Sequence, residues 1–183
     1  MSRSPLNIPG VLALALFLWQ GTAVAHVTST GVAGLEVLGD RLTYRLTLAP
    51  EEVDPLYVPI LEAAGRGEAA AVAQVDRALR AYARFAIEGE ACIPGAIGVP
   101  PVRDDDGKLV LEMALSCSRA IGTLRILDDW PDVLGAHFQT VMTVNVARRV
   151  AGQFVFIDAR REATLELQSV PVGGMTSFVL MGA

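Results

Sequence analysis

The sequence predicts a mainly β domain of the α+β class, a β-sandwich-like fold with a two-helix insertion. About eight short segments alternate apolar with polar residues, the period of half-buried strands. Two consecutive segments instead repeat their apolar residues at helical spacing. Because these helices interrupt the strands only once, the pattern favours a sandwich over alternating βαβ units.

The first strands are predicted to form a hairpin over residues 35–48, with Gly39 and Asp40 in its turn. In its second strand every other residue is apolar, so one face is expected to be buried and the other exposed to water. The residues of the buried face are Leu42, Tyr44, Leu46 and Leu48.

The two helices are predicted next. From Val53 to Ala64 apolar residues recur at helical spacing, with Asp54 as the expected N-cap and Pro55 at the first helical position. Pro59 lacks a backbone donor inside that helix, so we expect it to be short or kinked. A glycine-containing break at residues 65–67 precedes a second helix, whose apolar stripe consists of Val72, Val75, Leu79 and Tyr82.

After the helices, the sequence predicts one strand after another. The expected strands begin at residue 85 and continue through residues 108–117, 123–127, 138–146, 153–158 and 163–167. Residues 93–101 are expected to be a loop, because they are rich in proline and glycine. The run from Asp104 to Gly107 is predicted to be a hairpin turn, since it does not fit the register of an EF-hand calcium loop.

Residues 1–25 are predicted to be a secretory signal peptide. Arg3 provides a basic start, residues 8–19 are almost entirely apolar, and Ala23-Val24-Ala25 is an A-x-A processing site. The apolar run is shorter than the ~20 residues that a membrane-spanning helix needs. Since residue 26 is not cysteine, lipoprotein processing is not expected. We therefore expect export from the cytoplasm and a mature chain that begins at His26.

The mature chain is expected to be one β-rich domain, residues 26–168, with an acidic balance. Without Arg3, 14 basic residues stand against 20 acidic ones, a net charge of −6. This charge disfavours nucleic acid and an anionic membrane surface as partners.

Cys92 and Cys117 are the only cysteines in the sequence. An even number of cysteines in a small exported domain favours a disulfide, which would contribute roughly 3 kcal/mol through chain entropy. The alternative is a thiolate metal site, which would need more Cys or His ligands nearby in the sequence. We predict a structural disulfide between these two residues.

Residues 169–183 are predicted to be a linker followed by the start of a possible membrane segment. Pro171, Gly173 and Gly174 are typical of a linker, and residues 175–183 are apolar without a single charge. The apolar part is shorter than a membrane-spanning helix. An ordinary terminus or a last strand is therefore the alternative interpretation.

The two histidines, His26 and His137, suggest a metal site. At a mature N-terminus His26 would offer its α-amine and a ring nitrogen to one Cu(II) or Ni(II) ion, and His137 would add a third nitrogen ligand. We expect His137 on the polar face of its strand, together with Gln139 and Thr143. The alternatives are a terminal residue without a role and a solvent-exposed strand histidine, because the sequence alone does not bring the two together.

The sequence contains none of the catalytic motifs that we sought: a G-x-S-x-G elbow, a phosphate-binding glycine loop or an H-E-x-x-H helix. The acidic pairs at residues 51–52 and 128–129 lie at the edges of predicted elements, where exposed charge is expected. A hydrolase would need such a pair in a cleft. We therefore expect a protein that is not an enzyme, with a nickel or copper ion as its candidate ligand.

A set of features follows one another in a particular order along the mature chain. It begins with residues 25–29 (AHVTS) and a hairpin at residues 37–45 (VLGDRLTYR), followed by a helical insert that ends near Tyr82. Next come Cys92 before Pro94, a strand that ends at Cys117, a histidine within residues 134–138, and residues 153–156 (QFVF). Over most of residues 26–183 this order resembles the extracytoplasmic N-terminal domain of HupE/UreJ-type membrane proteins of Gram-negative bacteria.

The resemblance implies a periplasmic domain that precedes a bundle of membrane helices at the inner membrane. The relatives best known for that bundle are linked to the supply of nickel or related metals. The bundle typically opens with a segment resembling residues 177–182 (SFVLMG), and the sequence ends at Ala183, before the His- and Asp-bearing helix that would follow. We therefore expect either the outer domain of a longer membrane protein, with that membrane domain as its partner, or a stand-alone periplasmic protein that binds Cu or Ni through His26.

Overall fold

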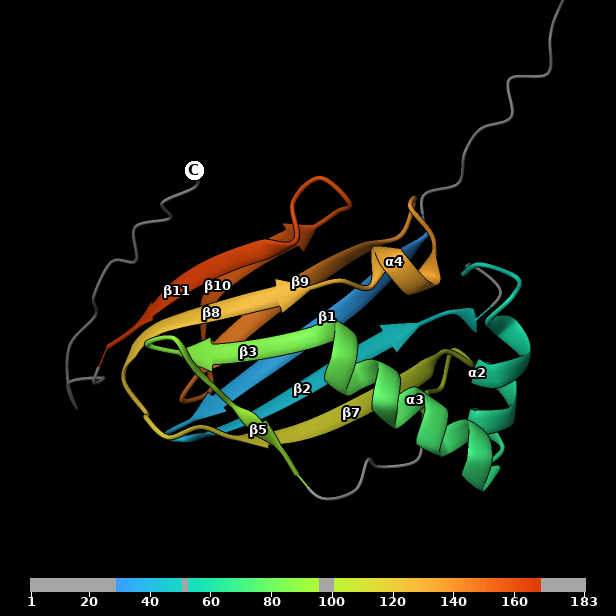
Figure 1. Ribbon diagram of the computed structural model, residues 1–183, viewed down its shortest axis with the longest axis horizontal. Coiled ribbons are helices and arrows are strands. Elements are labelled where there is room, and N and C mark those ends of the chain that lie inside the picture. Colours follow the sequence, from blue (N-terminus) through green and yellow to red (C-terminus); the bar gives the residue numbers. More distant parts are fainter. Residues whose placement is uncertain (1–28, 51–52, 96–100, 169–183) are drawn as a thin grey trace, which may run out of the picture.

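The computed structural model describes residues 29–50, 53–95 and 101–168, which form two β-sheets packed face to face. Figure 1 shows the sheets one behind the other, with the helices gathered at one end. The predicted fold class, a mainly β domain with a two-helix insertion, is confirmed. The predicted signal peptide, residues 1–25, and the predicted linker and membrane segment, residues 169–183, lie outside the described residues.

The larger sheet, sheet A, has β1 at its centre. β1 pairs antiparallel with β2 on one side and parallel with β9 on the other. Across the sheet the order is β10 (Arg149–Phe156), β9 (Gln139–Val146), β1 (Thr30–Leu38), β2 (Arg41–Leu48) and β7 (Leu109–Ser116), and the short strands β5 (Ile93–Pro94) and β6 (Val102–Arg103) both pair with β7.

The smaller sheet, sheet B, covers the inner face of sheet A. Its order is β11 (Glu162–Leu167), β8 (Gly122–Asp128), β3 (Ala83–Ile87) and β4 (Glu90–Ala91), all antiparallel. The apolar residues that alternate along β2, β7 and β8 point between the sheets and are buried. The alternation that predicted these strands therefore also forms the core.

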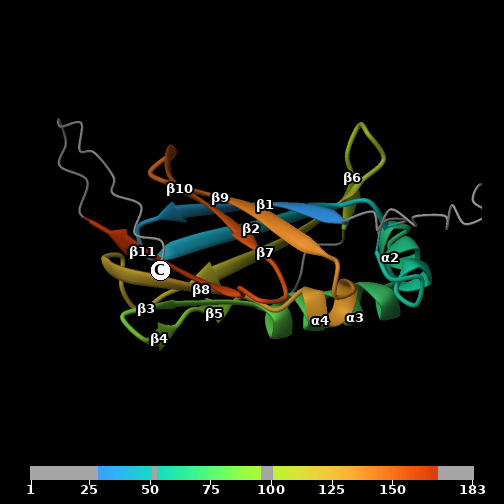
Figure 2. The same ribbon diagram turned by 90° about the horizontal axis from the view of Figure 1, so that it is seen from above.

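The helices lie on the sheet B side of the molecule, at the end where β1 begins (Figure 2). They are α2 (Val58–Gly65), α3 (Ala69–Tyr82) and the one-turn α4 (Pro131–Leu134). In α3 the side chains of Val75 and Leu79 are buried against the sandwich, as the helical spacing predicted. Among the described residues, none of the helices is both long and apolar enough to cross a bilayer.

The predicted start of α2 is wrong. Asp54 does not cap the helix: its Oδ1 accepts a hydrogen bond from the Leu56 backbone nitrogen at 2.9 Å, in a turn that precedes α2. The helix begins only at Val58, which places Pro59 in its first turn. The missing N–H of proline costs nothing there, because it has no helical partner in any case. The helix is short, as expected, but Pro59 lies at its start and not inside it.

Several strand boundaries also differ from the prediction. β1 begins at Thr30, five residues before the expected start at residue 35. β10 begins at Arg149, four residues earlier than expected, because a register shift between Val150 and Gly152 breaks the alternation there. The segment expected to be a loop after Cys92 forms β5 over its first two residues, Ile93–Pro94, and pairs with β7. The predicted turn at residues 104–107 is confirmed, with a hydrogen bond of 3.0 Å from the Gly107 nitrogen to the Asp104 carbonyl.

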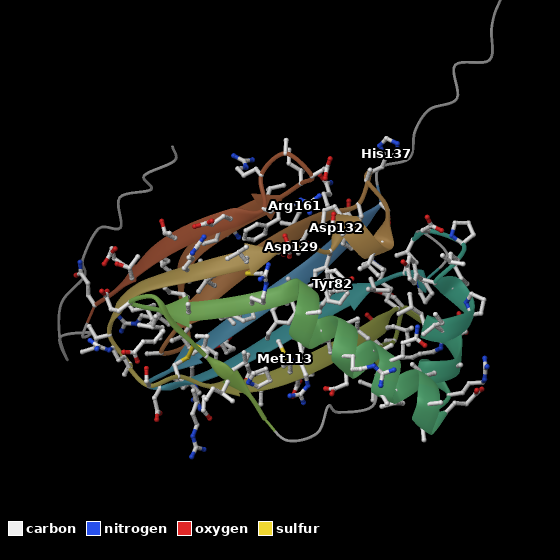
Figure 3. The ribbon with its side chains drawn as sticks, viewed as in Figure 1. Tyr82, Met113, Asp129, Asp132, His137 and Arg161 are labelled. Atoms are coloured by element: carbon white, nitrogen blue, oxygen red, sulfur yellow. A yellow bond between two sulfur atoms is a disulfide. The ribbon has the colours of Figure 1, made fainter. Side chains whose placement is uncertain are left out.

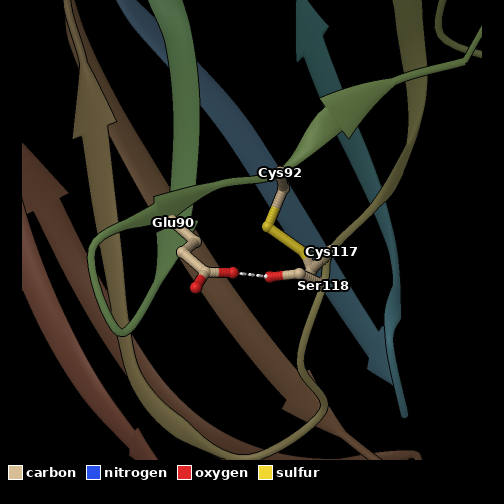
Figure 4. Close-up of a disulfide and its surroundings, with 4 residues drawn as sticks. All are labelled: Glu90, Cys92, Cys117 and Ser118. Atoms are coloured by element: carbon tan, nitrogen blue, oxygen red, sulfur yellow. Dashed lines mark hydrogen bonds between the residues drawn. A yellow bond between two sulfur atoms is a disulfide. The ribbon is translucent and has the colours of Figure 1, made fainter.

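The predicted disulfide between Cys92 and Cys117 is present (Figure 4). Cys92 lies where the chain passes from β4 in sheet B to β5 in sheet A, and Cys117 follows β7. The disulfide therefore holds the crossing between the two sheets. Beside it the Ser118 hydroxyl donates a hydrogen bond to Glu90, and this bond, with the nearby Arg119 charge, lowers the pKa of Glu90.

Replacing both cysteines, Cys92→Ala with Cys117→Ala, is expected to lower the free energy of unfolding by about 3 kcal/mol, because the unfolded chain gains loop entropy. Denaturant unfolding followed by circular dichroism measures this change. The wild-type protein in excess dithiothreitol serves as the control and should reach the same stability, whereas the reductant should not affect the double variant. A loss below about 1 kcal/mol would contradict a stabilising role for this disulfide.

Candidate functional site

The end of the sandwich that carries α4 gathers most of the polar and aromatic groups that invite a functional interpretation (Figure 3). Here β8 ends at Asp128, Trp130 immediately precedes α4, and His137 lies in the turn between α4 and β9. α3 ends nearby at Tyr82, whose backbone carbonyl accepts a hydrogen bond of 2.8 Å from the Asp129 nitrogen. The chain order of β8, α4 and β9 thus brings these residues to one place.

Two buried aromatic residues are joined by a hydrogen bond between the sheets. The Trp130 Nε1 donates to the Tyr44 hydroxyl oxygen at 3.0 Å, and both side chains are almost fully enclosed. Burial raises the pKa of Tyr44 well above its ordinary value, and the nearby Asp128 carboxyl raises it further. Tyr44 therefore stays protonated and acts as a structural polar group rather than as a base.

Asp128 is the most unusual residue of this end, because its carboxyl group is buried and few hydrogen bonds replace the water that it loses. It is 1% exposed. Its Oδ1 accepts hydrogen bonds from the Thr140 hydroxyl at 3.3 Å and from the Trp130 backbone nitrogen at 3.4 Å, both of them long. Its Oδ2 has no hydrogen-bond partner among the described residues. Desolvation outweighs these bonds and raises the pKa of Asp128 from its ordinary value of 3.8 to about 7.

The interpretation of the acidic pair at residues 128–129 as exposed charge is therefore wrong. Asp128 continues the inward-facing positions of β8, after Leu124 and Ile126, and so points into the core. Asp129 is only 16% exposed at its side chain and is held by Arg84 at 2.5 Å. The signal was present in the sequence, because extending the predicted strand by one residue places Asp128 on its apolar face.

Arg161 forms the centre of a charged cluster on the surface above Asp128. Its guanidinium lies 2.7 Å from Asp132 and 3.8 Å from Asp129, and it also donates to Asp158. The bonds to Asp158 and Asp132 raise the pKa of Arg161 above its ordinary value. The cluster joins the end of β8, α4 and the loop between β10 and β11. Because carboxylates surround the guanidinium, it serves as a clamp between these elements and not as an anion site.

An apolar pocket of about 60 Å³ lies between the helices and the sandwich. Trp130 forms part of its wall, whereas Asp128 does not line it. A group that enters the pocket therefore meets hydrocarbon and aromatic surface and no titratable side chain other than Tyr57. The lining residues are Leu48, Tyr57, Ile60, Leu61, Gln74, Val75, Ala78, Leu111, Trp130, Val133 and Leu134.

The predicted metal ligands can be placed only in part. His137 is exposed and lies in the turn that precedes β9, so its expected position on the polar face of the strand is wrong. Figure 3 shows it at the outer edge of the molecule, away from the Arg161 cluster. His26 lies outside the described residues. Over the described ranges, no three His, Cys, Asp or Glu side chains are grouped so that they could hold a metal ion.

Comparisons with known proteins do not add to this picture. No protein-family model matches the chain. No curated protein matches it either. The function must therefore be argued from the residues and their arrangement.

Replacing Asp128 with asparagine is expected to change how stability depends on pH. The folded protein keeps the Asp128 proton up to about pH 7, whereas the unfolded chain loses it near pH 3.8, so stability falls as the pH rises through this window. At pH 8 the buried, charged carboxyl lowers the free energy of unfolding of the wild-type protein by roughly 3 to 4 kcal/mol. The Asp128→Asn variant has no such charge and should keep this stability. Urea unfolding at pH 4.5 and pH 8 measures the difference.

The matched control for this experiment is Asp105→Asn, at an exposed position in the β6–β7 turn. It should follow the wild-type pH profile closely. If Asp128→Asn also follows that profile, the carboxyl is ionised in the folded protein at neutral pH, and the assignment of a raised pKa is wrong.

Proposed function

We propose that this chain is a non-catalytic periplasmic domain of a HupE/UreJ-like membrane protein, associated with nickel or other metal handling. The domain would stand on the outer side of the inner membrane and bind a partner or a metal ion. The resemblance in the order of sequence features suggests this assignment, and three features of the structure support it.

The observation that carries the proposal is where the described fold ends. β11, its last strand, ends at the buried Leu167, at the end of the sandwich opposite α2, α3 and α4 (Figures 1 and 2). The residues that follow include the uncharged apolar segment 175–183. A membrane attachment through this segment would place the helical end, with its pocket and His137, on the side away from the bilayer.

The disulfide between Cys92 and Cys117 supports an exported location. Disulfides persist in oxidising compartments such as the periplasm and are rare in the cytoplasm. Both sulfur-bearing residues are buried, 6% and 7% exposed, and they hold the crossing between the sheets. A fold that uses this bond as a structural element suits a compartment in which it forms.

The helical end supports binding rather than chemistry. Its pocket is apolar, its arginine is surrounded by carboxylates, and the carboxyl of Asp128 lies in the core and outside the pocket lining. Catalysis requires reactive groups that converge on a place where a substrate can sit. The arrangement described above instead offers a pocket for an apolar group.

Fractionation of the native cells tests the proposal. An antibody against residues 29–168 is expected to detect the protein in the membrane fraction, and protease added to spheroplasts should destroy the epitope because the domain faces outward. A cytoplasmic marker protein should survive the same treatment. A band found only in the soluble periplasmic fraction, below 19.4 kDa, would contradict membrane attachment, and a cytoplasmic band would contradict export.

The second candidate function is a stand-alone periplasmic protein that binds Cu(II) or Ni(II) through His26 and His137. One observation favours it: β1 and β9 run parallel, with Thr30 opposite Gln139, and the Ser29 carbonyl accepts a hydrogen bond from the Gln139 nitrogen at 2.9 Å. The chain therefore enters β1 beside the turn that holds His137. His26 precedes Ser29 by three positions in the sequence, at most about 11 Å of extended chain, a length that would allow both histidines to reach one ion.

Metal titration followed by visible absorption tests this candidate. The mature protein is expected to bind one Cu(II) tightly, and His137→Ala is expected to weaken binding because one nitrogen ligand is lost. An extra alanine before His26 should weaken it as well, because the α-amine moves away from the imidazole. The control variant, Asp132→Asn, alters a carboxylate of α4 that pairs with Arg161 and should leave binding unchanged. Tight binding that survives both changes would contradict this site.

A further inference from the structure

Two turns of sheet A lie side by side at the end of the sandwich opposite the helices. The β1–β2 turn spans residues 38–41, and the β9–β10 turn spans residues 146–149. The Ala147 nitrogen donates a hydrogen bond of 3.0 Å to the Val37 carbonyl, which joins the two turns directly. Figure 2 shows the β9–β10 turn projecting at this end, beyond β1 and β2. The two turns therefore form one continuous surface.

This surface carries three arginines that form no ion pair with any residue the structure describes. Arg41, Arg148 and Arg149 are exposed, and none of them takes part in a salt bridge within the described part of the chain. By contrast, eight other arginines are paired with carboxylates: Arg45, Arg66, Arg80, Arg84, Arg103, Arg119, Arg125 and Arg161. Asp40 is the one carboxylate in the two turns, which leaves them a net charge of +2.

The β9–β10 turn keeps its arginine at a strained position. Ala147 and Arg148 have φ angles of 48° and 64°, the left-handed region that a two-residue hairpin turn of this kind requires. Asn-Gly is the favoured pair there, because other residues meet a steric cost at positive φ. Strained positions of this type are often found at functional surfaces. Retention of an arginine here points to a use for its charge.

Apolar side chains accompany these charges. Leu38 at the end of β1 is 53% exposed, and Val150 near the start of β10 is 60% exposed. Both lie on the outer face of sheet A. Leu38 is out of phase with the buried positions of β1, and the register shift in β10 places Val150 opposite Asn145, which is out of phase with the buried positions of β9. Apolar side chains next to unpaired cations are the combination that binds the interface of an anionic membrane, where the hydrocarbon enters between the headgroups.

We propose that the β1–β2 and β9–β10 turns bind the surface of an anionic lipid bilayer. The chain leaves β11 at this same end, so the turns would face the membrane to which the proposed function attaches the domain. The inference rests on the proposed function for this orientation alone. The unpaired arginines, the strained turn and the exposed apolar residues are properties of the surface itself.

The overall charge of the chain does not oppose this binding. The net charge of −6 for the mature chain predicted no affinity for an anionic surface, but interactions at 0.1 M salt are screened beyond a Debye length of about 10 Å. Glu90, near this end, accepts a hydrogen bond from the Ser118 hydroxyl and forms an ion pair with Arg119. Glu88 accepts a hydrogen bond from the Thr123 nitrogen. Glu88 lies in the turn between β3 and β4, and Glu90 is the first residue of β4, so both belong to sheet B and lie outside the two turns of sheet A.

Vesicle flotation with the full exported chain tests the proposal. We compare its partitioning onto phosphatidylcholine vesicles with that onto vesicles containing one quarter phosphatidylglycerol, at about 0.1 M salt. The wild-type protein should prefer the anionic vesicles, and the preference should disappear at about 1 M salt, where the Debye length is about 3 Å. Each arginine is expected to raise the partition coefficient onto anionic vesicles about fivefold. The triple variant R41Q/R148Q/R149Q should therefore partition onto these vesicles roughly 100-fold more weakly.

Two further variants serve as controls. The triple variant R77Q/K108Q/R160Q removes the same charge from exposed positions at the helical end and should bind like the wild-type protein. The variant R41K/R148K/R149K keeps the charge of the turns and should retain the anionic preference. Equal binding of the wild-type protein to both kinds of vesicle would overturn the proposal, as would an equally large loss in the helical-end variant.

A fluorescence measurement locates the contact independently of the C-terminal segment. Val150→Trp places an indole on the proposed surface, and Leu56→Trp places one at the exposed turn before α2. Only the emission of the first should shift to the blue on anionic vesicles, against the constant background of buried Trp130. A shift at position 56 alone would overturn the proposal. Cell fractionation, by contrast, reports attachment through the C-terminal segment, so the failure of one proposal is separable from the failure of the other.

Discussion

The fold depends on the hydrogen bond by which Trp130 satisfies the buried hydroxyl of Tyr44. Tyr44 lies on the inner face of sheet A, and Trp130 lies where β8 leaves sheet B, so this bond connects the two sheets. The rings of Tyr82 and Phe85 pack 6.0 Å from Trp130 and 5.3 Å from Tyr44, and they extend the contact to α3 and β3. A buried tyrosine hydroxyl without a hydrogen-bond partner would cost more free energy than burial of the ring contributes. The position of Trp130 therefore determines where α4, and with it the start of β9, can lie.

Local patterns in the sequence were sufficient to predict the parts of the fold that depend on local chemistry. The alternation in β2 and β7 predicted both their extent and their buried faces, and the even number of cysteines predicted the disulfide. The prediction failed where a neighbour in space decides the outcome. The register shift in β10 depends on its pairing with β9, and Asp128 is buried because sheet A covers its side of β8. The parallel pairing of β1 with β9 has no local signal at all.

The candidate sites show the same division. The sequence named His137 but misplaced it, because the boundary between a turn and a strand depends on where the partner strand β1 begins. The sequence also gives a net charge, but this number is a sum over the whole chain and does not show where the charges lie. Most of the arginines counted in that sum are held by carboxylates in exposed pairs that contribute little to stability. Which cations remain unpaired is a property of the fold, and composition cannot provide it.

The parallel pairing of β1 with β9 also governs the order in which the molecule can assemble. Thr30 and Gln139, hydrogen-bonded neighbours at the start of the two strands, are 109 residues apart in the chain. β1 can form a hairpin with β2 as soon as both are synthesised, but its other edge stays without its native neighbour until β9 has emerged. Closing so long a loop is slow, because its entropy is lost before the new contacts form. The centre of sheet A is therefore among the last parts of the protein to be completed, and until then its longest strand presents an open edge to any chain nearby.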